Sequence, residues 1–329
     1  MRRTIVVGAG IMGAWTARRL AQDGHAVTVL EAKRAPCSGV TAHSFGWINS
    51  INSRPGSRDH TDRRAALALW RAWSHPSTQR SGALVWADRP AETRALCAAR
   101  RAAGDAVRLC DPPEIAALAP ALAAPPLAML AHDDLAVDTA MACAALLDGV
   151  ETRFGVRVRA VLDRAGRTVG VATDAGPILA DTVVLATGPN LPDLPGPGSR
   201  PTLPISPAVM VRARLAQPRR LLNTILNGPD IEIRQTSDLS LRLSRAADPA
   251  LDEAGHAAAA ADAIARYFPG AGPLTKIAAR IVERPYPPAD PGLPGLFLAI
   301  AHPGVILAPL IAQRIAKRLA AKKTKETVA

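Results

Sequence analysis

The fold is decided by the stretch Thr4-Ile5-Val6-Val7-Gly8-Ala9-Gly10-Ile11-Met12-Gly13. A short β-branched run leads into three glycines with the spacing G-x-G-x-x-G. Residues 11–23 then have helical spacing, and Gly24 is well placed to end that helix. A second apolar strand covers residues 26–30, and Glu31 stands at its end. Strand, glycine turn, helix, strand and acid in this order predict a dinucleotide-binding βαβ unit.

Each residue type in this unit has a physical role in binding a dinucleotide. Gly8 allows the tight turn, Gly10 lets the backbone approach a pyrophosphate, and Gly13 lets the helix and strand pack closely. The start of the helix offers free N–H groups and the positive end of its dipole to the phosphates. Glu31 can accept hydrogen bonds from ribose hydroxyls. NADP is disfavoured, because its 2′-phosphate would require an arginine rather than an acid at this position. The motif alone leaves NAD and FAD as alternatives.

The composition indicates a globular chain that is long enough for two domains. Its 329 residues are enough for two sizeable cores. The net charge of +12 could suggest nucleic acid, but the arginines are scattered and aromatic residues make up only 3%. We therefore expect no nucleic-acid partner. No run of 18 apolar residues suggests a membrane span. The oligomeric state is left open.

The cysteines predict free thiols in a reducing cytoplasm. Cys37, Cys97, Cys110 and Cys143 show no C-x-x-C spacing and no associated histidine cluster, so we expect no metal site. The start of the chain superficially resembles a signal peptide, but Arg18 and Arg19 interrupt its apolar run.

The rest of the chain predicts an α/β protein with antiparallel material in the middle. Residues 139–154 have helical spacing, and residues 182–186 form an all-apolar strand that is typical of a buried parallel position. A β-meander is expected over residues 156–161, 168–173 and 178–179, and an antiparallel hairpin over 231–235 and 239–243. Because βαβ-like segments at the two ends frame this material, a nucleotide domain with a second domain inserted into it is expected.

Three further stretches carry a family resemblance. They are CSGVTAHSFGWIN at residues 37–49, DTVVLATG at residues 181–188, and HPGVILAPL at residues 302–310. Together with the N-terminal fingerprint, they resemble the FAD-dependent D-amino acid oxidase superfamily, which includes glycine and sarcosine oxidases. The resemblance spans most of the chain.

The resemblance implies a glutathione-reductase-like FAD domain with an inserted, mostly antiparallel α+β substrate domain, and the flavin at their interface. The FAD domain is expected over residues 1–75, 136–200 and 286–329, and the substrate domain over 76–135 and 201–285. The residues that would bind FAD are Gly8, Gly10, Ile11, Met12, Gly13, Glu31, Ala32, Lys33, Ser38, Gly39, Thr41, His43, Ser44, Val158, Ala186, Thr187, Gly188, Gly304, Val305 and Ile306. Histidine holds FAD covalently in one group of relatives at the position of His43, but we expect non-covalent FAD here.

The chemistry that the resemblance implies is oxidation of a carbon next to nitrogen, with hydride transfer to flavin N5 and hydrolysis of the imine. Small amino acids and N-alkyl amino acids are the expected substrates. Arg284, in a stretch similar to the family's R-P-x-x-x-D-G, would anchor the substrate carboxylate, and Tyr286 would line the same pocket. Arg234 and Arg242 are the next candidates for this anchor.

Three alternatives remain at this stage. One is an FAD-dependent 2-hydroxy acid dehydrogenase, and another is a flavin-binding subunit or scaffold without turnover. The third, an NAD-linked dehydrogenase, explains the first thirty residues but not the stretches at 186–188 and 304–309.

Overall fold

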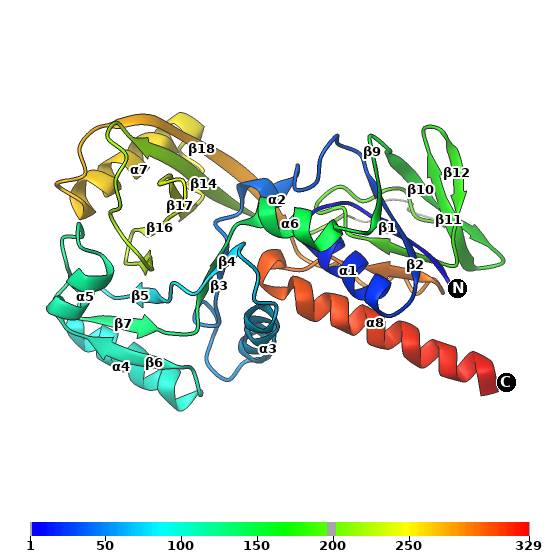
Figure 1. Cartoon of the computed structure of the whole chain (residues 1–329), viewed down its shortest axis with the longest axis horizontal. Coiled ribbons are helices and arrows are strands. Elements are labelled where there is room, and N and C mark those ends of the chain that lie inside the picture. The colour runs from blue at the N-terminus through cyan, green and yellow to red at the C-terminus, as the bar shows by residue number, and fades with distance from the viewer. Residues whose placement is uncertain (1, 196–201, 329) are drawn as a thin grey trace. The chain divides into compact units, whose positions relative to one another are not determined.

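The structure, a computed structural model, describes residues 2–195 and 202–328, with side chains as far as residue 321. The chain divides into two compact units. Unit 1 comprises Met1–Ser44, Thr139–Ser206 and Glu283–Ala329, and unit 2 comprises Phe45–Asp138 and Pro207–Val282. Figure 1 labels most of the elements of both units.

Residues 45–75 are the main difference between these units and the expected domains. The sequence assigned them to the FAD domain, whereas the structure has them in unit 2. The strand β3 (Trp47–Ile48) pairs with β8 (Leu135–Val137), which in turn pairs with β4 (Thr78–Gln79). The Trp47 side chain is buried in a core cluster with residues of unit 2. Long-range pairing and burial therefore decide where this segment belongs.

Unit 1 is built on a parallel sheet with the strand order β19-β13-β1-β2-β9 among the described residues. Its strands are β1 (Arg3–Val7), β2 (Ala26–Glu31), β9 (Glu151–Phe154), β13 (Thr182–Leu185) and β19 (Leu296–Leu298). Every residue of β13 is buried, as its apolar sequence predicts. Val7 pairs with Leu185, so the chain leaves β1 and β13 at the same edge of the sheet.

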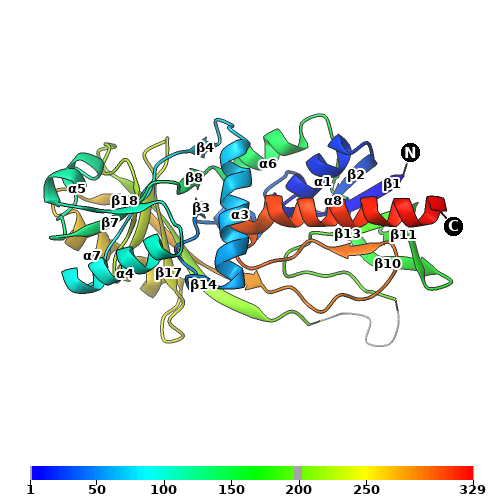
Figure 2. The same cartoon turned by 90° about the horizontal axis from the view of Figure 1, so that it is seen from below.

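The helices of unit 1 are α1 (Ile11–Gln22), α2 (Val40–His43), α6 (Thr139–Leu147) and α8 (Gly304–Val328). The helix α1 packs against α6 and α8, and Figure 2 shows α8 running beside it. Ile11, Ala14, Ala17 and Leu20 form the buried stripe of α1 at helical spacing. This stripe holds the glycine turn against the sheet.

The helix expected over residues 139–154 is wrong in its last part. The helix α6 ends at Leu147, Gly149 has a φ of 73°, and residues 151–154 form β9 at the sheet edge. Thr152 pairs with Val29 of β2, so sheet pairing overrides the helical spacing there. The predicted meander is present as β10 (Val158–Arg164), β11 (Arg167–Thr173) and β12 (Gly176–Leu179).

Unit 2 contains most of a larger sheet, with the order β18-β14-β17-β16-β15-β5-β7-β6 within the described ranges. From β14 to β6 neighbouring strands are antiparallel, except for the parallel pair β15–β5. The bounds are β5 (Ala83–Val85), β6 (Val107–Cys110), β7 (Ala128–Ala131), β14 (Ile205–Leu215), β15 (Ile225–Asn227), β16 (Glu232–Gln235), β17 (Leu241–Ala246) and β18 (Leu274–Pro285). The boundary between the units falls inside β14 and β18.

The helices of unit 2 are α3 (Arg58–Ala72), α4 (Pro90–Ala102), α5 (Pro112–Leu118) and α7 (Glu253–Tyr267). The helix α5 begins with a capping box, in which the side chains of Asp111 and Glu114 each accept the other residue's N–H. In the part of the chain that the structure describes, no helix combines the length and apolar character needed to cross a bilayer.

Candidate functional site

The glycine turn after β1 has the geometry that its sequence predicts. Gly8 has a φ of 107°, and a Cβ there would lie 2.5 Å from the carbonyl oxygen of Ala186. A Cβ on Gly13 would lie 1.9 Å from the carbonyl oxygen of Gly8. Both positions therefore require glycine, one for the turn and the other for the close packing of α1 on that turn.

The start of α1 offers its backbone N–H groups. Gly10 is the N-cap and supplies no side chain, and the first turn contains no acidic residue. The Ile11 N–H is directed at Thr41 Oγ1 at 3.3 Å, and a Cβ on Gly10 would come within 3.0 Å of that oxygen. A helix start of this kind, with its positive dipole end, suits an anion such as a pyrophosphate.

Glu31 lies against the glycine turn. One carboxylate oxygen accepts the N–H of Ala9 and the other accepts the N–H of Lys33, both at 2.8 Å. The next residues, Ala32 and Lys33, are exposed, and Gly155 donates its N–H to the Lys33 carbonyl at 2.9 Å. The acid at the end of β2 is thus held next to the turn, where a ribose is expected.

The segment 38–44 also lies beside the glycine turn. Cys37 donates its N–H to the Ala9 carbonyl at 3.0 Å, and Thr41 accepts from Ile11. Thr139 Oγ1, which the sequence did not single out, donates to the Thr41 carbonyl at 3.0 Å. The structure therefore brings this segment to the predicted site through the backbone of Cys37 and the hydroxyl group of Thr41.

The other predicted residues of this segment surround α2. Ser38 is exposed and donates its hydroxyl to the Ala35 carbonyl at 2.7 Å. Gly39 caps the start of α2, and His43 ends the helix as a half-buried residue that Ser44 follows.

The end of β13 closes the same edge of the sheet. Ala186 donates its N–H to the Val7 carbonyl at 2.8 Å, and Gly188 has a φ of 63°. The Thr187 hydroxyl oxygen is buried and has no hydrogen-bond partner in residues 2–195 and 202–328. A buried hydroxyl without a partner is costly, and a bound ligand can satisfy it. Val158, on β10, is half-buried and pairs with Thr173.

The start of α8 forms another part of unit 1. Gly304, Val305 and Ile306 are its first three residues, and a Cβ on Gly304 would meet nothing within 4 Å. The space beside the Gly304 Cα is therefore open. Just before it, the ring of His302 lies against the ring of Tyr286, with their centroids 4.7 Å apart.

Arg284 and Tyr286 belong to this same region. Arg284 donates from Nε to the Ser206 carbonyl at 3.3 Å and from Nη2 to the Ser206 hydroxyl at 3.1 Å. Tyr286 donates its N–H to the Pro204 carbonyl at 2.9 Å. These bonds fix the end of β18, and the ring contact with His302 brings Tyr286 to the start of α8.

The two alternative arginines are placed differently. Arg234 is 5% exposed and donates to the carbonyls of Val137, at 3.0 Å, and of Phe45. Burial lowers the pKa of its guanidinium to about 9. Arg242 lies opposite it in the β16–β17 pair. Arg234 therefore holds two segments of unit 2 together, which is a structural role that the sequence did not predict.

The residues of unit 1 fit a dinucleotide. The glycine turn, the uncapped start of α1, the Glu31 carboxylate and the Thr187 hydroxyl come together at one edge of the sheet. They offer N–H donors for phosphates, an acceptor for ribose hydroxyls and a buried hydroxyl that needs a partner.

The comparisons with known proteins concern the fold and the family of the chain. The chain resembles glycine oxidase from Geobacillus kaustophilus, with a TM-score of 0.77, 21% identity, and coverage of 96% of this chain and 94% of that one. Glycine oxidase from Bacillus cereus matches with a TM-score of 0.80 and 14% identity over 98% of this chain and 96% of that one. For L-proline dehydrogenase from P. horikoshii the TM-score is 0.77 and the identity 19%, over 96% and 93%.

At these identities the likeness shows the fold. A sequence comparison with curated proteins finds no significant match. The family description "FAD dependent oxidoreductase" (DAO) matches residues 3–318, nearly the whole chain. The dinucleotide is therefore FAD, and the chain is an oxidoreductase that belongs to the FAD-dependent DAO family.

Proposed function

We propose that this flavoenzyme oxidises the C–N bond of a small amino acid or N-alkyl amino acid. The observation that carries the proposal is the placement of Arg284 in unit 1. Ser206 fixes the guanidinium of Arg284 by two hydrogen bonds. Tyr286 follows Arg284 by two residues, and its ring contacts the ring of His302, just before the start of α8. A fixed guanidinium suits a substrate carboxylate. The names of the similar structures, glycine oxidase and L-proline dehydrogenase, also support an amino-acid substrate.

Some residues of unit 1 would bind FAD, and others would orient the substrate. Gly8, Gly10 and the start of α1 would hold the pyrophosphate, and Glu31 would accept from the ribose. Bound FAD supplies the acceptor for the hydride that leaves the carbon next to nitrogen. Arg284 would fix the carboxylate, so that this carbon keeps one position and one orientation.

The start of α8 would add an electrostatic contribution. Its first N–H groups, from Gly304 to Ile306, carry the positive end of a long helix dipole. The start of this helix stabilises negative charge that develops near it.

We infer that FAD is held without a covalent bond. We also infer a cytoplasmic enzyme, because its four cysteines are buried thiols that form no disulfide bond.

Product analysis tests the proposal. The purified flavoprotein is incubated with glycine, sarcosine, and the D and L forms of alanine and proline, next to glycolate and lactate as the matching 2-hydroxy acids. From at least one nitrogen compound we expect the 2-oxo acid with an equal amount of ammonia or amine, or, in the case of proline, the cyclic imine and its ring-opened hydrolysis product. Products from the hydroxy acids alone would instead assign the enzyme to 2-hydroxy acid oxidation.

A further inference from the structure

Unit 2 contains a pocket of about 310 Å³ beneath α3. All the residues that line it belong to unit 2. Leu67 and Ala68 of α3 form part of its apolar wall, and the charged residues at its edge and floor are Arg64, Arg71, Asp105, Asp133 and Asp134. The volume is at the small end of the range in which ligand sites occur.

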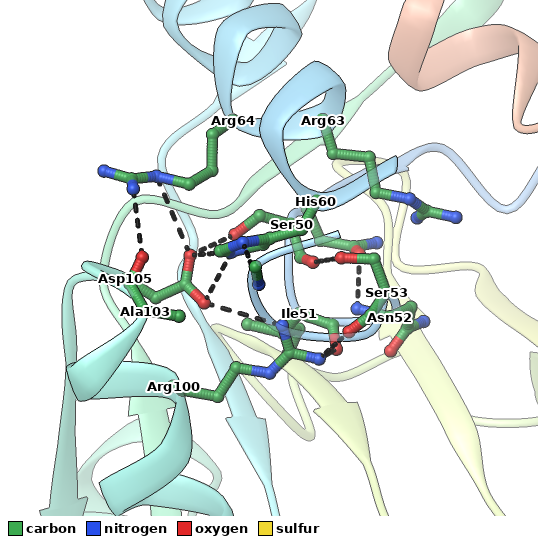
Figure 3. Close-up of polar contacts among 12 residues, drawn as sticks. Ser50, Ile51, Asn52, Ser53, His60, Arg63, Arg64, Arg100, Ala103 and Asp105 are labelled. Carbon is green, nitrogen blue, oxygen red and sulfur yellow. Dashed lines mark hydrogen bonds and ion pairs between the residues drawn. The ribbon is translucent and has the colours of Figure 1, made fainter. Parts of the chain in front are cut away.

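One floor residue, Asp105, is saturated by neighbours (Figure 3). Its carboxylate accepts from Ser50 Oγ at 2.7 Å and lies 3.0 Å from His60 Nε2. His60 Nδ1 accepts the N–H of Gly56, so the ring hydrogen is on Nε2 and is directed at Asp105. Arg100 Nη1 lies 3.6 Å from Oδ2 of Asp105. Asp105 is therefore a fixed and satisfied part of the floor.

The second floor residue, Asp134, is different. It is 2% exposed and lines the pocket, and its Oδ2 accepts from Trp47 Nε1 at 2.8 Å. Its Oδ1 has no hydrogen-bond partner in the described part of the chain. Burial raises the pKa of this carboxyl well above its usual range, and the charges of Asp105 and Asp133 raise it further. Arg100 acts on Asp134 only from a distance, and the described residues form no ion pair with it, so an ammonium group in the pocket would stabilise the ionised form of this carboxyl.

Two guanidinium groups stand at the edge of the pocket. Arg64 donates to the Ala103 carbonyl at 3.1 Å and lies 4.0 Å from Asp105, and its side chain is 48% exposed. Arg71 pairs with Asp133, also partly exposed. The two arginines are seven residues apart, about two turns, so they lie on the same face of α3. Exposed ion pairs contribute little, so a ligand carboxylate can share or replace these partners.

We propose that this pocket binds a small zwitterion, an α-amino acid, with its ammonium group on Asp134 and its carboxylate on Arg64 or Arg71. The ammonium group would stabilise the ionised form of Asp134, and the arginines would balance the carboxylate of the ligand. The proposal concerns binding in unit 2 and does not depend on the oxidation proposed above.

The test uses the FAD-loaded protein and 2-aminoisobutyrate, an α-amino acid that has no hydrogen on its α-carbon and so cannot lose a hydride there. Because Trp47 donates to Asp134, its indole ¹H–¹⁵N signal reports on the pocket. Trp47→Phe assigns this signal. We expect 2-aminoisobutyrate to shift it saturably, and methylamine and acetate to bind at least about tenfold more weakly, because each loses one charged contact.

Matched variants on α3 separate the pocket from other sites. Ala68 lines the pocket and is exposed, so Ala68→Trp should fill the space and abolish the shift. Ala65 is exposed on the same helix but does not line the pocket, so Ala65→Trp should keep the shift. Asp134→Asn should weaken binding by about tenfold or more.

Three results would overturn the inference. The first is a Trp47 signal that 2-aminoisobutyrate does not move. The second is a failure of either comparison: an equal shift of the Trp47 signal in Ala68→Trp and Ala65→Trp, or an affinity for methylamine equal to that for 2-aminoisobutyrate. The third is loss of the shift in Arg284→Ala, which would assign the response to the proposed oxidation site instead.

Discussion

The carboxylate of Glu31 accepts the backbone N–H of Ala9 at 2.8 Å, which ties the end of β2 to the glycine turn after β1. The same carboxylate accepts the N–H of Lys33. A single side chain therefore holds the backbone on both sides of the place where a ribose is expected. The shape of the turn therefore depends on this acid, and we propose that ribose binding depends on it too.

Glu31→Ala should weaken FAD binding by about 1.5–3 kcal/mol, because charge-assisted hydrogen bonds are lost. Glu31→Gln keeps one acceptor oxygen, so its affinity for FAD should lie between those of the wild type and Glu31→Ala. Titration of the apoprotein with FAD measures both affinities. The rate of flavin reduction by a substrate should stay normal once the variants are saturated with FAD. An unchanged affinity in Glu31→Ala would remove this residue from the site.

Gly13→Ala should abolish FAD binding or folding, since the added Cβ would lie 1.9 Å from the Gly8 carbonyl oxygen. Overpacking of this kind costs about 1–3 kcal/mol or more, because backbone atoms have to move. Gly270→Ala is the matched control, because a Cβ there would meet only Arg219 Nη2, at 3.9 Å. Flavin content and thermal unfolding measure the effect. Equal behaviour of the two variants would contradict the packing of α1 described here.

FAD should leave the protein on acid precipitation. His43 ends the short helix α2 near the candidate site, but we expect it to form no covalent bond to the cofactor. The measurement is the yellow colour of the supernatant and pellet after precipitation. Flavin that stays in the pellet, and is lost from it in His43→Ala, would show a covalent link.

Arg284→Ala should lower kcat/KM for an amino acid roughly ten- to a hundredfold for each charged bond lost. Arg284→Lys keeps the charge but loses the two-point fork, so it should be intermediate. Flavin content should stay normal in both variants. The decarboxylated amine of the same substrate is the control, because it has no carboxylate to anchor. If Arg284→Ala slows both compounds equally, or neither, the anchor is elsewhere.

The glycine fingerprint was readable from the sequence because its constraints are local. Gly8 and Gly13 contact each other within one turn, and Glu31 returns to the same turn one βα unit later. The roles of Arg234 and Asp105 could not be read in this way. Arg234 contacts carbonyls 97 and 189 residues away, and Asp105 meets His60 from a distance of 45 residues. Such contacts depend on strand order rather than on spacing.

The strand β9 shows the same limit. Residues 151–154 continue the spacing of α6, yet they pair with β2, and Thr28 donates its hydroxyl to Glu151 at 2.9 Å. These residues pair with the edge strand β2 of the parallel sheet, and helix propensity, which depends only on the local sequence, cannot predict this pairing.

The pH dependence of stability should reveal Asp134. Burial raises the pKa of this carboxyl in the folded state, so folding retains a proton that the unfolded chain loses above about pH 4. Its contribution is full below that pH and is lost as the pH rises through the folded pKa. Asp134→Asn has no such titration. The melting temperature of the wild type should therefore fall relative to the variant as the pH is raised from 4. Parallel curves would show that Asp134 titrates normally.

Anaerobic reduction of the bound flavin tests the central claim most directly. The purified, FAD-loaded protein is mixed without oxygen with glycine, sarcosine, and the D and L forms of alanine and proline, and the visible flavin band is followed. We predict that at least one of these compounds bleaches the band, because its C–N bond is oxidised as the flavin is reduced. A band that none of them changes, while a 2-hydroxy acid bleaches it, would contradict the account.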